Sequence, residues 1–102
     1  MKNDTSIFPL VSVVIPTRNE ESNIKNVVQS VIRQAPEDVE LEVIVVDDGS
    51  TDGTVDIARS AGAHVLELGR QGAEGNPALA RNRGAAIAKG DPVIFLDADC
   101  EV

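Results

Sequence analysis

Aromatic residues are almost absent from this chain of 102 residues, which holds two Phe and neither Trp nor Tyr. Proteins that bind single-stranded nucleic acid stack bases on aromatic side chains, and such platforms are missing here. Basic residues are also scarce, since 9 Lys and Arg stand against 17 Asp and Glu, for a formal net charge of −8 at pH 7. A phosphate-backbone partner needs a stripe of Lys and Arg. These two shortages exclude nucleic acid as the expected partner.

Cysteine and long apolar runs are equally scarce. The single cysteine, Cys100, cannot form an intrachain disulfide, and a lone thiol is ordinary in a reducing compartment. No segment approaches the roughly 18 apolar residues that a membrane-spanning helix needs, and residues 1–9 are too few and too polar for a signal peptide. We therefore expect a cytoplasmic protein without a membrane segment of its own, with membrane association left open for a longer parent.

The composition that remains is that of one small globular domain, with 42% apolar and 25% charged residues. A chain of this length has room for one hydrophobic core and no second domain. We expect residues 1–9 to form a flexible leader and residues 10–102 to form the folded part.

Strand patterns occur four times along the folded part. A β-branched run over 10–15 is closed by Pro16, which lacks the N–H that a central strand needs. The run over 41–46 is almost continuously apolar, a pattern typical of a parallel strand covered on both faces. Shorter apolar runs at 63–68 and 92–96 predict two further strands.

Helix patterns alternate with these strands. Apolar residues between Ile24 and Ile32 recur at helical spacing and form one face, with acids and a serine just before them. A second helix is expected over 54–61, ended by Gly62, and a third from Pro77 to Lys89, opened by Asn76 and ended by Gly90, after a glycine-rich loop over 69–76. This order predicts an α/β fold, a mostly parallel sheet with helices on both faces.

Three of the predicted strands end in short polar and acidic clusters. The carboxyl ends of parallel strands lie along one edge, where open α/β sheets bind ligands, so these clusters are expected to converge in one crevice. The clusters are Pro16-Thr17-Arg18-Asn19-Glu20, Asp47-Asp48-Gly49-Ser50 and Asp97-Ala98-Asp99. So many carboxylates would repel a phosphorylated ligand unless a divalent cation or an Arg offset them, and we therefore expect a metal.

Two of these clusters allow a more specific interpretation. Asp97 and Asp99 stand two residues apart just past a strand, where both carboxylates can reach a hard cation and its bound phosphates, although such pairs also occur as solvated turn residues. The pair Asp47 and Asp48 directly follows a strand, which puts at least one of the two carboxylates on the crevice. A purely structural explanation, a turn followed by a helix cap at Asp52, accounts only for the residues after this pair and not for the pair itself.

Four segments in order resemble the signatures of the family 2 inverting glycosyltransferases, the GT-A fold group that includes dolichol-phosphate mannose synthases and cellulose synthase-like enzymes. They are residues 16–20 (PTRNE), 46–54 (VDDGSTDGT), 80–84 (ARNRG) and 96–99 (LDAD). The resemblance covers nearly the whole chain and implies the Rossmann-like N-terminal half of a GT-A fold. It implies a UDP- or GDP-linked sugar donor, a Mg²⁺ or Mn²⁺ ion, and transfer of the sugar to an acceptor with inversion at the anomeric carbon.

The resemblance also implies roles for residues of the first two segments. Pro16, Thr17 and Glu20 would contact the donor nucleoside. Asp48, with Asp47 beside it, would hydrogen-bond the base. Glu20 also has a purely structural explanation, because acids are favoured in the first turn of a helix whatever the ligand.

For the last two segments, the resemblance implies contacts with phosphates and metal. Arg81 would lie near the base and phosphates, although a solvated helix residue paired with nearby acids explains it equally well. Asp97 would face the ribose or the metal, and Asp99 would be the metal ligand that bridges to the diphosphate. Asn82 and Gly84 are expected to serve helix packing.

The catalytic base and the acceptor pocket lie, in members of this family, beyond the segment that corresponds to residues 11–99. No base can therefore be named, and we expect the donor-binding portion of an enzyme, with an uncovered sheet edge that favours self-association. Two other functions stay open: a non-catalytic nucleotide-binding or interaction module, and a nucleotidyltransferase of similar architecture. The latter calls for a glycine-rich loop after the first strand, which residues 16–20 lack.

Overall fold

Seven helices and strands make up the fold in the computed structural model, which describes residues 9–69 and 76–98. In chain order they are β1 (Leu10–Thr17), α1 (Ile24–Gln34), β2 (Glu40–Asp47), α2 (Thr54–Ala61), β3 (His64–Glu67), α3 (Pro77–Ile87) and β4 (Val93–Phe95). The predicted leader up to residue 8, most of the predicted loop over 69–76, and Asp99 with Cys100 lie outside the described residues.

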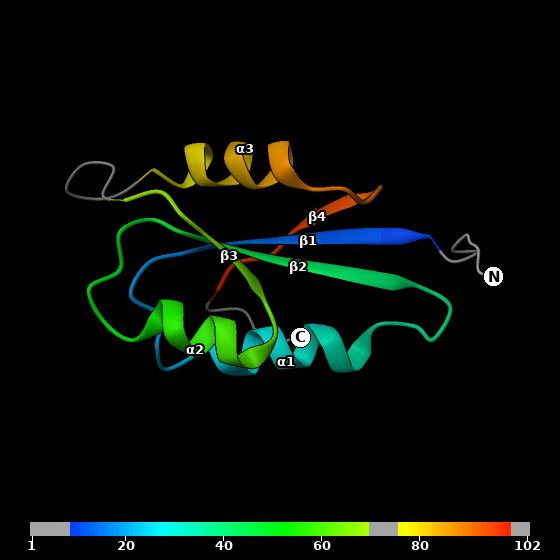
Figure 1. The fold of residues 1–102 in the computed structure, drawn as a ribbon, viewed down its shortest axis with the longest axis horizontal. Helices are drawn as coiled ribbons and strands as arrows, with labels where there is room; N and C mark the ends of the chain where they lie inside the picture. Colours follow the sequence, from blue (N-terminus) through cyan, green and yellow to red (C-terminus); the bar gives the residue numbers. More distant parts are fainter. Residues whose placement is uncertain (1–8, 70–75, 99–102) are drawn as a thin grey trace.

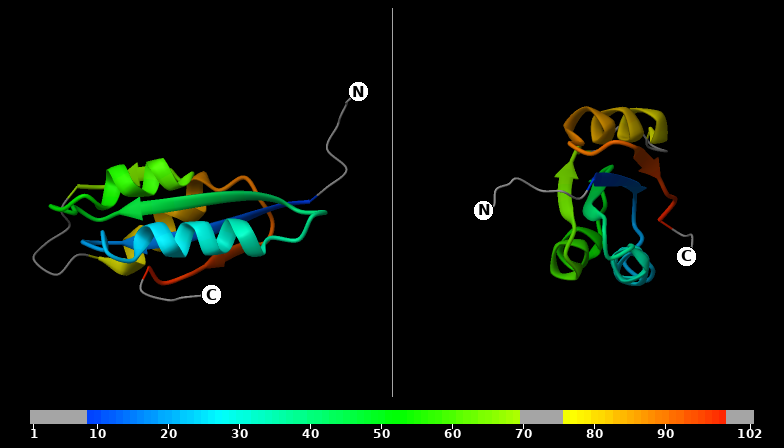
Figure 2. Two further views of the ribbon diagram at one scale, coloured as in Figure 1. Left: turned by 90° about the horizontal axis from the view of Figure 1, so that it is seen from below. Right: turned by 90° about the vertical axis from the view of Figure 1, so that its right-hand side faces the viewer.

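The four strands form one parallel sheet in the order β3-β2-β1-β4. Helices α1 and α2 cover one face of this sheet and α3 covers the other (Figures 1 and 2). The predicted α/β fold with helices on both faces is therefore confirmed.

The core is divided between these two faces because successive side chains of a strand point to opposite sides. The residues with odd numbers in β1 and β2 pack toward α1 and α2, and those with even numbers pack toward α3. The first set contains Val13, Ile15, Val43 and Val45, and the second contains Val14, Ile44 and Val46. Both sets are buried, which explains why β1 and β2 are apolar without alternation.

The first strand continues through Pro16 to Thr17, so the prediction that it ends before the proline was wrong. The amide of Leu96 donates to the carbonyl of Val14 over 3.0 Å, which shows that backbone groups of even-numbered β1 residues face β4. Pro16 has the same orientation but lies beyond the last β1–β4 pair, Val14 with Phe95. Its missing N–H therefore interrupts no bond of the sheet.

Helix α1 contains the whole predicted apolar face, α2 has the predicted bounds, and α3 ends earlier than predicted. Gly62 ends α2 with a φ of 111°, the left-handed conformation that favours glycine. Asn76 caps α3 as predicted, since its side-chain oxygen accepts from the amide of Leu79 over 3.0 Å. Helix α3 ends at Ile87, two residues before the predicted end at Lys89.

This early end of α3 has a physical cause in the turn that leads to β4. The amide of Lys89 donates to a carboxylate oxygen of Glu42 over 2.8 Å, and the amide of Gly90 donates to the hydroxyl of Ser12 over 2.8 Å. The Ser12 hydroxyl in turn donates to the same oxygen of Glu42 over 2.7 Å. The bond from the amide of Lys89 and then the bond from the Ser12 hydroxyl hold the pKa of Glu42 below its ordinary value of 4.5. A Cβ at Gly90 would lie 2.7 Å from the carbonyl oxygen of Leu10. The turn is thus held against β1 and fixes where β4 begins.

The last strand forms one edge of the sheet as far as the described residues extend. Ile94 and Phe95 are each 47% exposed, and an apolar groove of about 340 Å³ runs beside this edge, with Val11 and Val31 among its lining residues. The self-association expected from an uncovered sheet edge stays a prediction.

Each helix in the described part of the chain is too short or too polar to cross a lipid bilayer.

Close packing of α3 on the sheet depends on Gly84, which is buried, whereas Asn82 is exposed and does not have the packing role predicted for it. A Cβ at position 84 would overlap the side chain of Val14 and lie 2.9 Å from Cγ2 of Val46. Both valines belong to the core beneath α3, so the helix approaches them because it has no side chain there.

We expect the Gly84→Ala substitution to lower the free energy of unfolding by about 1–2 kcal/mol, because an overpacking cost of about 2–3 kcal/mol outweighs the roughly 1 kcal/mol gain in helix propensity. Urea denaturation followed by circular dichroism measures this change. The matched control is Asn82→Ala on the exposed side of α3, which should leave the stability unchanged or slightly higher. A Gly84→Ala variant as stable as the wild type would contradict the described packing.

Candidate functional site

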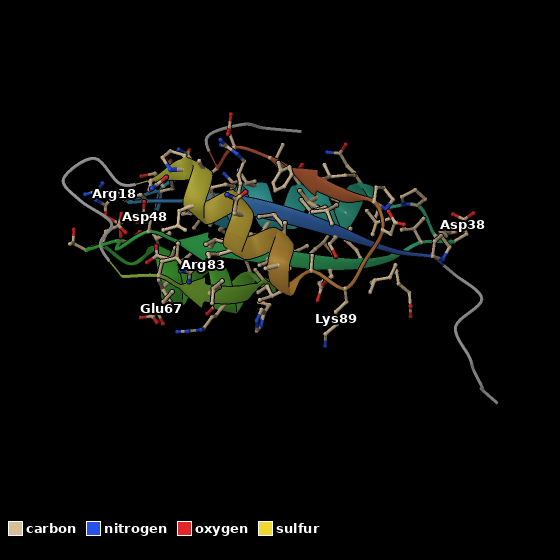
Figure 3. The ribbon with its side chains drawn as sticks, turned by 90° about the horizontal axis from the view of Figure 1, so that it is seen from above. Arg18, Asp38, Asp48, Glu67, Arg83 and Lys89 are labelled. Atoms are coloured by element: carbon tan, nitrogen blue, oxygen red, sulfur yellow. The ribbon has the colours of Figure 1, made fainter. Side chains whose placement is uncertain are left out.

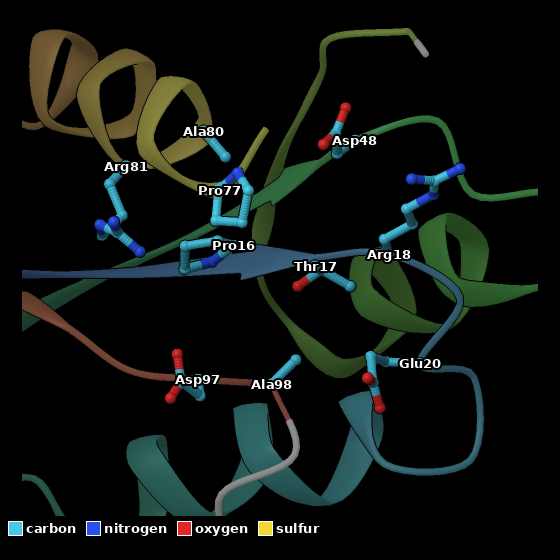
Figure 4. A pocket seen from close by; sticks show the side chains of 10 residues that line it. All are labelled: Pro16, Thr17, Arg18, Glu20, Asp48, Pro77, Ala80, Arg81, Asp97 and Ala98. Atoms are coloured by element: carbon cyan, nitrogen blue, oxygen red, sulfur yellow. The ribbon is translucent and has the colours of Figure 1, made fainter. Parts of the chain in front are cut away.

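The carboxyl edge of the sheet holds a cleft of about 320 Å³, within the range of small-molecule sites. Arg18 and Asp48 lie at this end of the sheet, opposite the end that carries Asp38 (Figure 3). The end of β1, the segments that follow β1, β2 and β4, and the first turns of α3 line the cleft (Figure 4). The lining residues are Pro16, Thr17, Arg18, Glu20, Asp48, Pro77, Ala80, Arg81, Asp97 and Ala98.

Asp48 is the most unusual group in the cleft. Its side chain is only 5% exposed, its backbone amide donates to the carbonyl of Thr17 over 2.9 Å, and its Oδ2 accepts from the amide of Asn76 over 2.6 Å. Its Oδ1 is buried without a hydrogen-bond partner among the described residues. Buried carboxylate oxygens are rarely left unpaired, because the lost hydration is costly. Among the described residues, Asp48 Oδ1 is thus a buried acceptor whose hydrogen-bonding capacity is unused.

Asp47, the neighbouring acid, is placed differently. It ends β2, is 3% exposed, and accepts from the hydroxyl and from the amide of Ser50, the latter over 3.1 Å. Asp47 is not among the residues that line the cleft. The sequence predicted that Asp47 or Asp48 faces the crevice, and the structure places Asp48 there.

The end of β1 contributes the predicted Pro16 and Thr17, and the segment after it contributes the predicted Glu20; all three line the cleft. Thr17 is buried, and its hydroxyl donates to the carbonyl of Ile15 over 3.0 Å, which fixes the end of the strand. Arg18 lines the cleft as well, and sequence reasoning did not assign it a role. It is the only cation of its cluster, and that position between two predicted contacts was the signal that could have identified it.

The far side of the cleft carries Arg81 on α3 and Asp97 after β4, as the sequence predicted. Figure 4 shows Asp97 on the side of β1 away from Asp48, with Arg81 above it. Its predicted companion Asp99 lies outside the described residues. Within the described ranges, no group of three or more His, Cys, Asp or Glu residues could hold a metal by itself. A cation at Asp97 would therefore need further oxygen ligands.

The charges in this lining nearly cancel, with two cations against three anions. The anions are Glu20, Asp48 and Asp97, and the cations are Arg18 and Arg81. An anionic ligand therefore meets arginines on two sides but carries charge into a region that is already slightly negative.

The chain resembles known glycosyltransferases in sequence and in structure. It is 41% identical over 98 residues to glycosyltransferase AglE of Haloferax volcanii, and this match covers 94% of this chain and 32% of AglE. Among solved structures, it is similar to S. aureus TarS in complex with UDP, with a TM-score of 0.74, 36% identity, and coverage of 87% of this chain and 27% of that one. It is also similar to the mannosyltransferase PcManGT from Pyrobaculum calidifontis in complex with GDP-Man and Mn²⁺, with a TM-score of 0.74 and 32% identity. That match covers 94% of this chain and 29% of PcManGT.

The chain thus spans about a third or less of the length of these relatives. The sequence profile of glycosyl transferase family 2 matches residues 12–102, which includes every segment that forms the cleft. The chain therefore belongs to glycosyl transferase family 2 and has the α/β fold of the N-terminal portion of its GT-A domain.

Proposed function

We propose that the cleft binds the nucleoside diphosphate part of a sugar donor, UDP- or GDP-linked, with a divalent cation. The whole protein to which this portion corresponds would transfer the sugar to an acceptor with inversion at the anomeric carbon. The unpaired Oδ1 of Asp48 is the observation that carries this proposal. Family membership favours it over a nucleotidyltransferase.

In this proposal, the base of the nucleotide supplies the hydrogen-bond donor that Oδ1 of Asp48 lacks. Uracil and guanine each carry a ring N–H, and an ionised carboxylate is an acceptor with two oxygens. Oδ2 of Asp48 is already held by the amide of Asn76, so Oδ1 is fixed in orientation before the ligand arrives. TarS has been crystallised with UDP and PcManGT with GDP-Man, which supports both bases as candidates for this chain.

The diphosphate requires positive charge that the cleft supplies only in part. Arg18 and Arg81 flank the space, and guanidinium groups suit phosphate oxygens because their donors form a planar fork. The exposed carboxylate of Asp97 fits a Mg²⁺ or Mn²⁺ ion, since Mg²⁺ is commonly held by one or two carboxylates together with the substrate's phosphates. Asp99 is proposed as the second carboxylate. When bound, the cation would stabilise the negative charge that gathers on the departing diphosphate.

The residues of β1 complete the nucleoside site in this proposal. Pro16 and Thr17 form the floor between Asp48 and Asp97, and Glu20 stands at the end of the same segment (Figure 4). The alternative is a nucleotide-binding module without transfer activity. Both functions need the same cleft, and sugar transfer by the whole protein to which this portion corresponds distinguishes them.

The Asp48→Asn substitution tests the contact with the base. Asn keeps the shape of the side chain but replaces one carboxylate oxygen by an NH2 group, which cannot accept a hydrogen bond. Either the bond from the amide of Asn76 or the bond from the ligand is therefore lost. We expect UDP or GDP to bind about 10- to 100-fold more weakly in isothermal titration calorimetry with Mn²⁺, the range for a hydrogen bond to a charged group.

The matched control is Asp38→Asn, which removes an exposed carboxylate at the opposite end of the sheet. It should bind the nucleotide as the wild type does. Equal affinity of Asp48→Asn and wild type would remove the main support for the proposal.

The Asp97→Asn substitution tests the metal. Without metal, we expect nucleotide affinity to stay unchanged or to rise slightly, because a negative charge near the phosphates is removed. With Mn²⁺, the variant should lose most of the gain in affinity that the ion gives the wild type. The measurement is calorimetric titration of UDP and GDP with Mn²⁺ and with EDTA. A variant that retains the full Mn²⁺-dependent gain would exclude Asp97 as a ligand.

A further inference from the structure

Hydrogen bonds join the two loops that follow β1 and β2, although these loops lie about 30 residues apart in the chain. The loop after β1 supplies residues 19–21, and the loop after β2 supplies residues 50–53 together with Thr54, the first residue of α2. We call the set the loop bridge. Its bonds run from the amide of Asn19 to Ser50 Oγ (2.8 Å), from the amide of Thr51 to Asn19 Oδ1 (2.8 Å), from the amide of Glu20 to Thr54 Oγ1 (2.9 Å), from the amide of Glu21 to Asp52 Oδ2 (3.3 Å) and from the amide of Gly53 to Glu21 Oε1 (3.0 Å).

Asn19 is the residue of the bridge with the most specific requirements. Its φ is 52°, a left-handed conformation that Asn adopts more readily than most residues. Its side-chain oxygen accepts from the amide of Thr51 and, at 3.4 Å, from the hydroxyl of the same residue. The residues on either side, Arg18 and Glu20, line the cleft, whereas Asn19 does not. The turn at Asn19 thus presents both neighbours to the cleft.

The other end of the bridge leads to the base contact. The hydroxyl of Ser50 accepts from the amide of Asn19 and donates to Asp47, the buried acid that precedes Asp48. A continuous path of hydrogen bonds therefore connects the loop that carries Arg18 with the strand end that carries Asp48. Thr54 adds a second link, because its hydroxyl accepts from the amide of Glu20 and donates to Asp52. That bond from Thr54 is the main cause that keeps the pKa of Asp52 below its ordinary value of 3.8.

We infer that Asn19 is a positioning residue of the nucleotide site, which holds the Arg18–Glu20 segment in register with Asp48 so that the base and the phosphates are bound together. This inference rests on the proposed function of the cleft. Preorganised groups lose less conformational freedom when a ligand binds, which raises affinity without any contact between Asn19 and the ligand.

The role of Asn19 can be separated from simple stability by three substitutions. Asn19→Ala removes the acceptor and disfavours the left-handed turn. Asn19→Gly removes the acceptor but permits the turn. Asn19→Asp retains both an acceptor oxygen and tolerance of the turn. Asn26→Ala, on an exposed position of α1, is the matched control.

We expect Asn19→Ala to bind UDP or GDP with Mn²⁺ about tenfold more weakly than the wild type, the equivalent of one or two hydrogen bonds. Asn19→Gly should bind with intermediate affinity, and Asn19→Asp and Asn26→Ala should bind nearly as the wild type does. Calorimetry at physiological ionic strength limits the effect of the added charge in Asn19→Asp. Amide hydrogen exchange of Thr51, measured by NMR without ligand, should be slow in the wild type and Asn19→Asp and faster in Asn19→Ala.

Each other outcome overturns the inference in a recognisable way. Unchanged affinity of Asn19→Ala would show that the bridge does not serve the site. A loss of affinity in Asn19→Ala that Asn19→Asp fails to restore, with Thr51 still protected, would show that the acceptor oxygen is not what matters. If the wild type binds neither UDP nor GDP, the proposed function fails, and slow exchange at Thr51 would then mark the bridge as a purely structural feature.

Discussion

The parallel pairing of β1 with β2 is the interaction on which the site depends. Its register places Thr17 opposite Asp47, and the amide of Asp48 continues the pairing with a bond to the carbonyl of Thr17. Both strands therefore end at the same level, and the loops that leave them are close enough to form hydrogen bonds with each other. A shift of this register by one residue would exchange the β2 side chains between the two faces of the sheet and turn Asp48 away from α3 and the cleft.

The pairing of β1 with β4 adds the third side of the cleft. Phe95 lies opposite Val14, so Asp97 comes to the level of Pro16 although it is some 80 residues distant in sequence. The close packing of Gly84 on Val14 and Val46 brings α3 down onto the same end of the sheet, and with it Arg81. The cleft is thus a consequence of sheet topology, assembled from residues that no local motif contains together.

The sequence predicted the strands and helices well because apolar spacing and cap residues are local signals. It failed where tertiary contacts decide. Pro16 stays in β1 because the neighbouring strand has already ended, and α3 stops at Ile87 because Glu42 and Ser12 capture the next amides. Neither contact can be recognised from the residues around the element itself.

The choice between Asp47 and Asp48 illustrates the same limit within the site. Two adjacent acids at a strand end point to opposite faces, so the side on which the cleft lies decides between them. Asp48 has the same parity as Val46, which faces α3, and α3 supplies one wall of the cleft. Once the side of α3 is known, the choice follows; the sequence alone gives both candidates. Asp97 lines the cleft because it follows two residues after Phe95, the last β4 residue that pairs with β1, and its role toward ribose or metal stays a prediction.

The central claim is that the carboxyl edge of this sheet binds a nucleoside diphosphate through Asp48. A crystal structure of the chain with UDP or GDP and Mn²⁺ tests it most directly. The account predicts a ring N–H of the base within about 3 Å of Asp48 Oδ1, the usual range of a hydrogen bond, with the diphosphate directed toward Asp97. A nucleotide bound at the opposite end of the sheet, or bound in the cleft with Asp48 Oδ1 still unpaired, would contradict it.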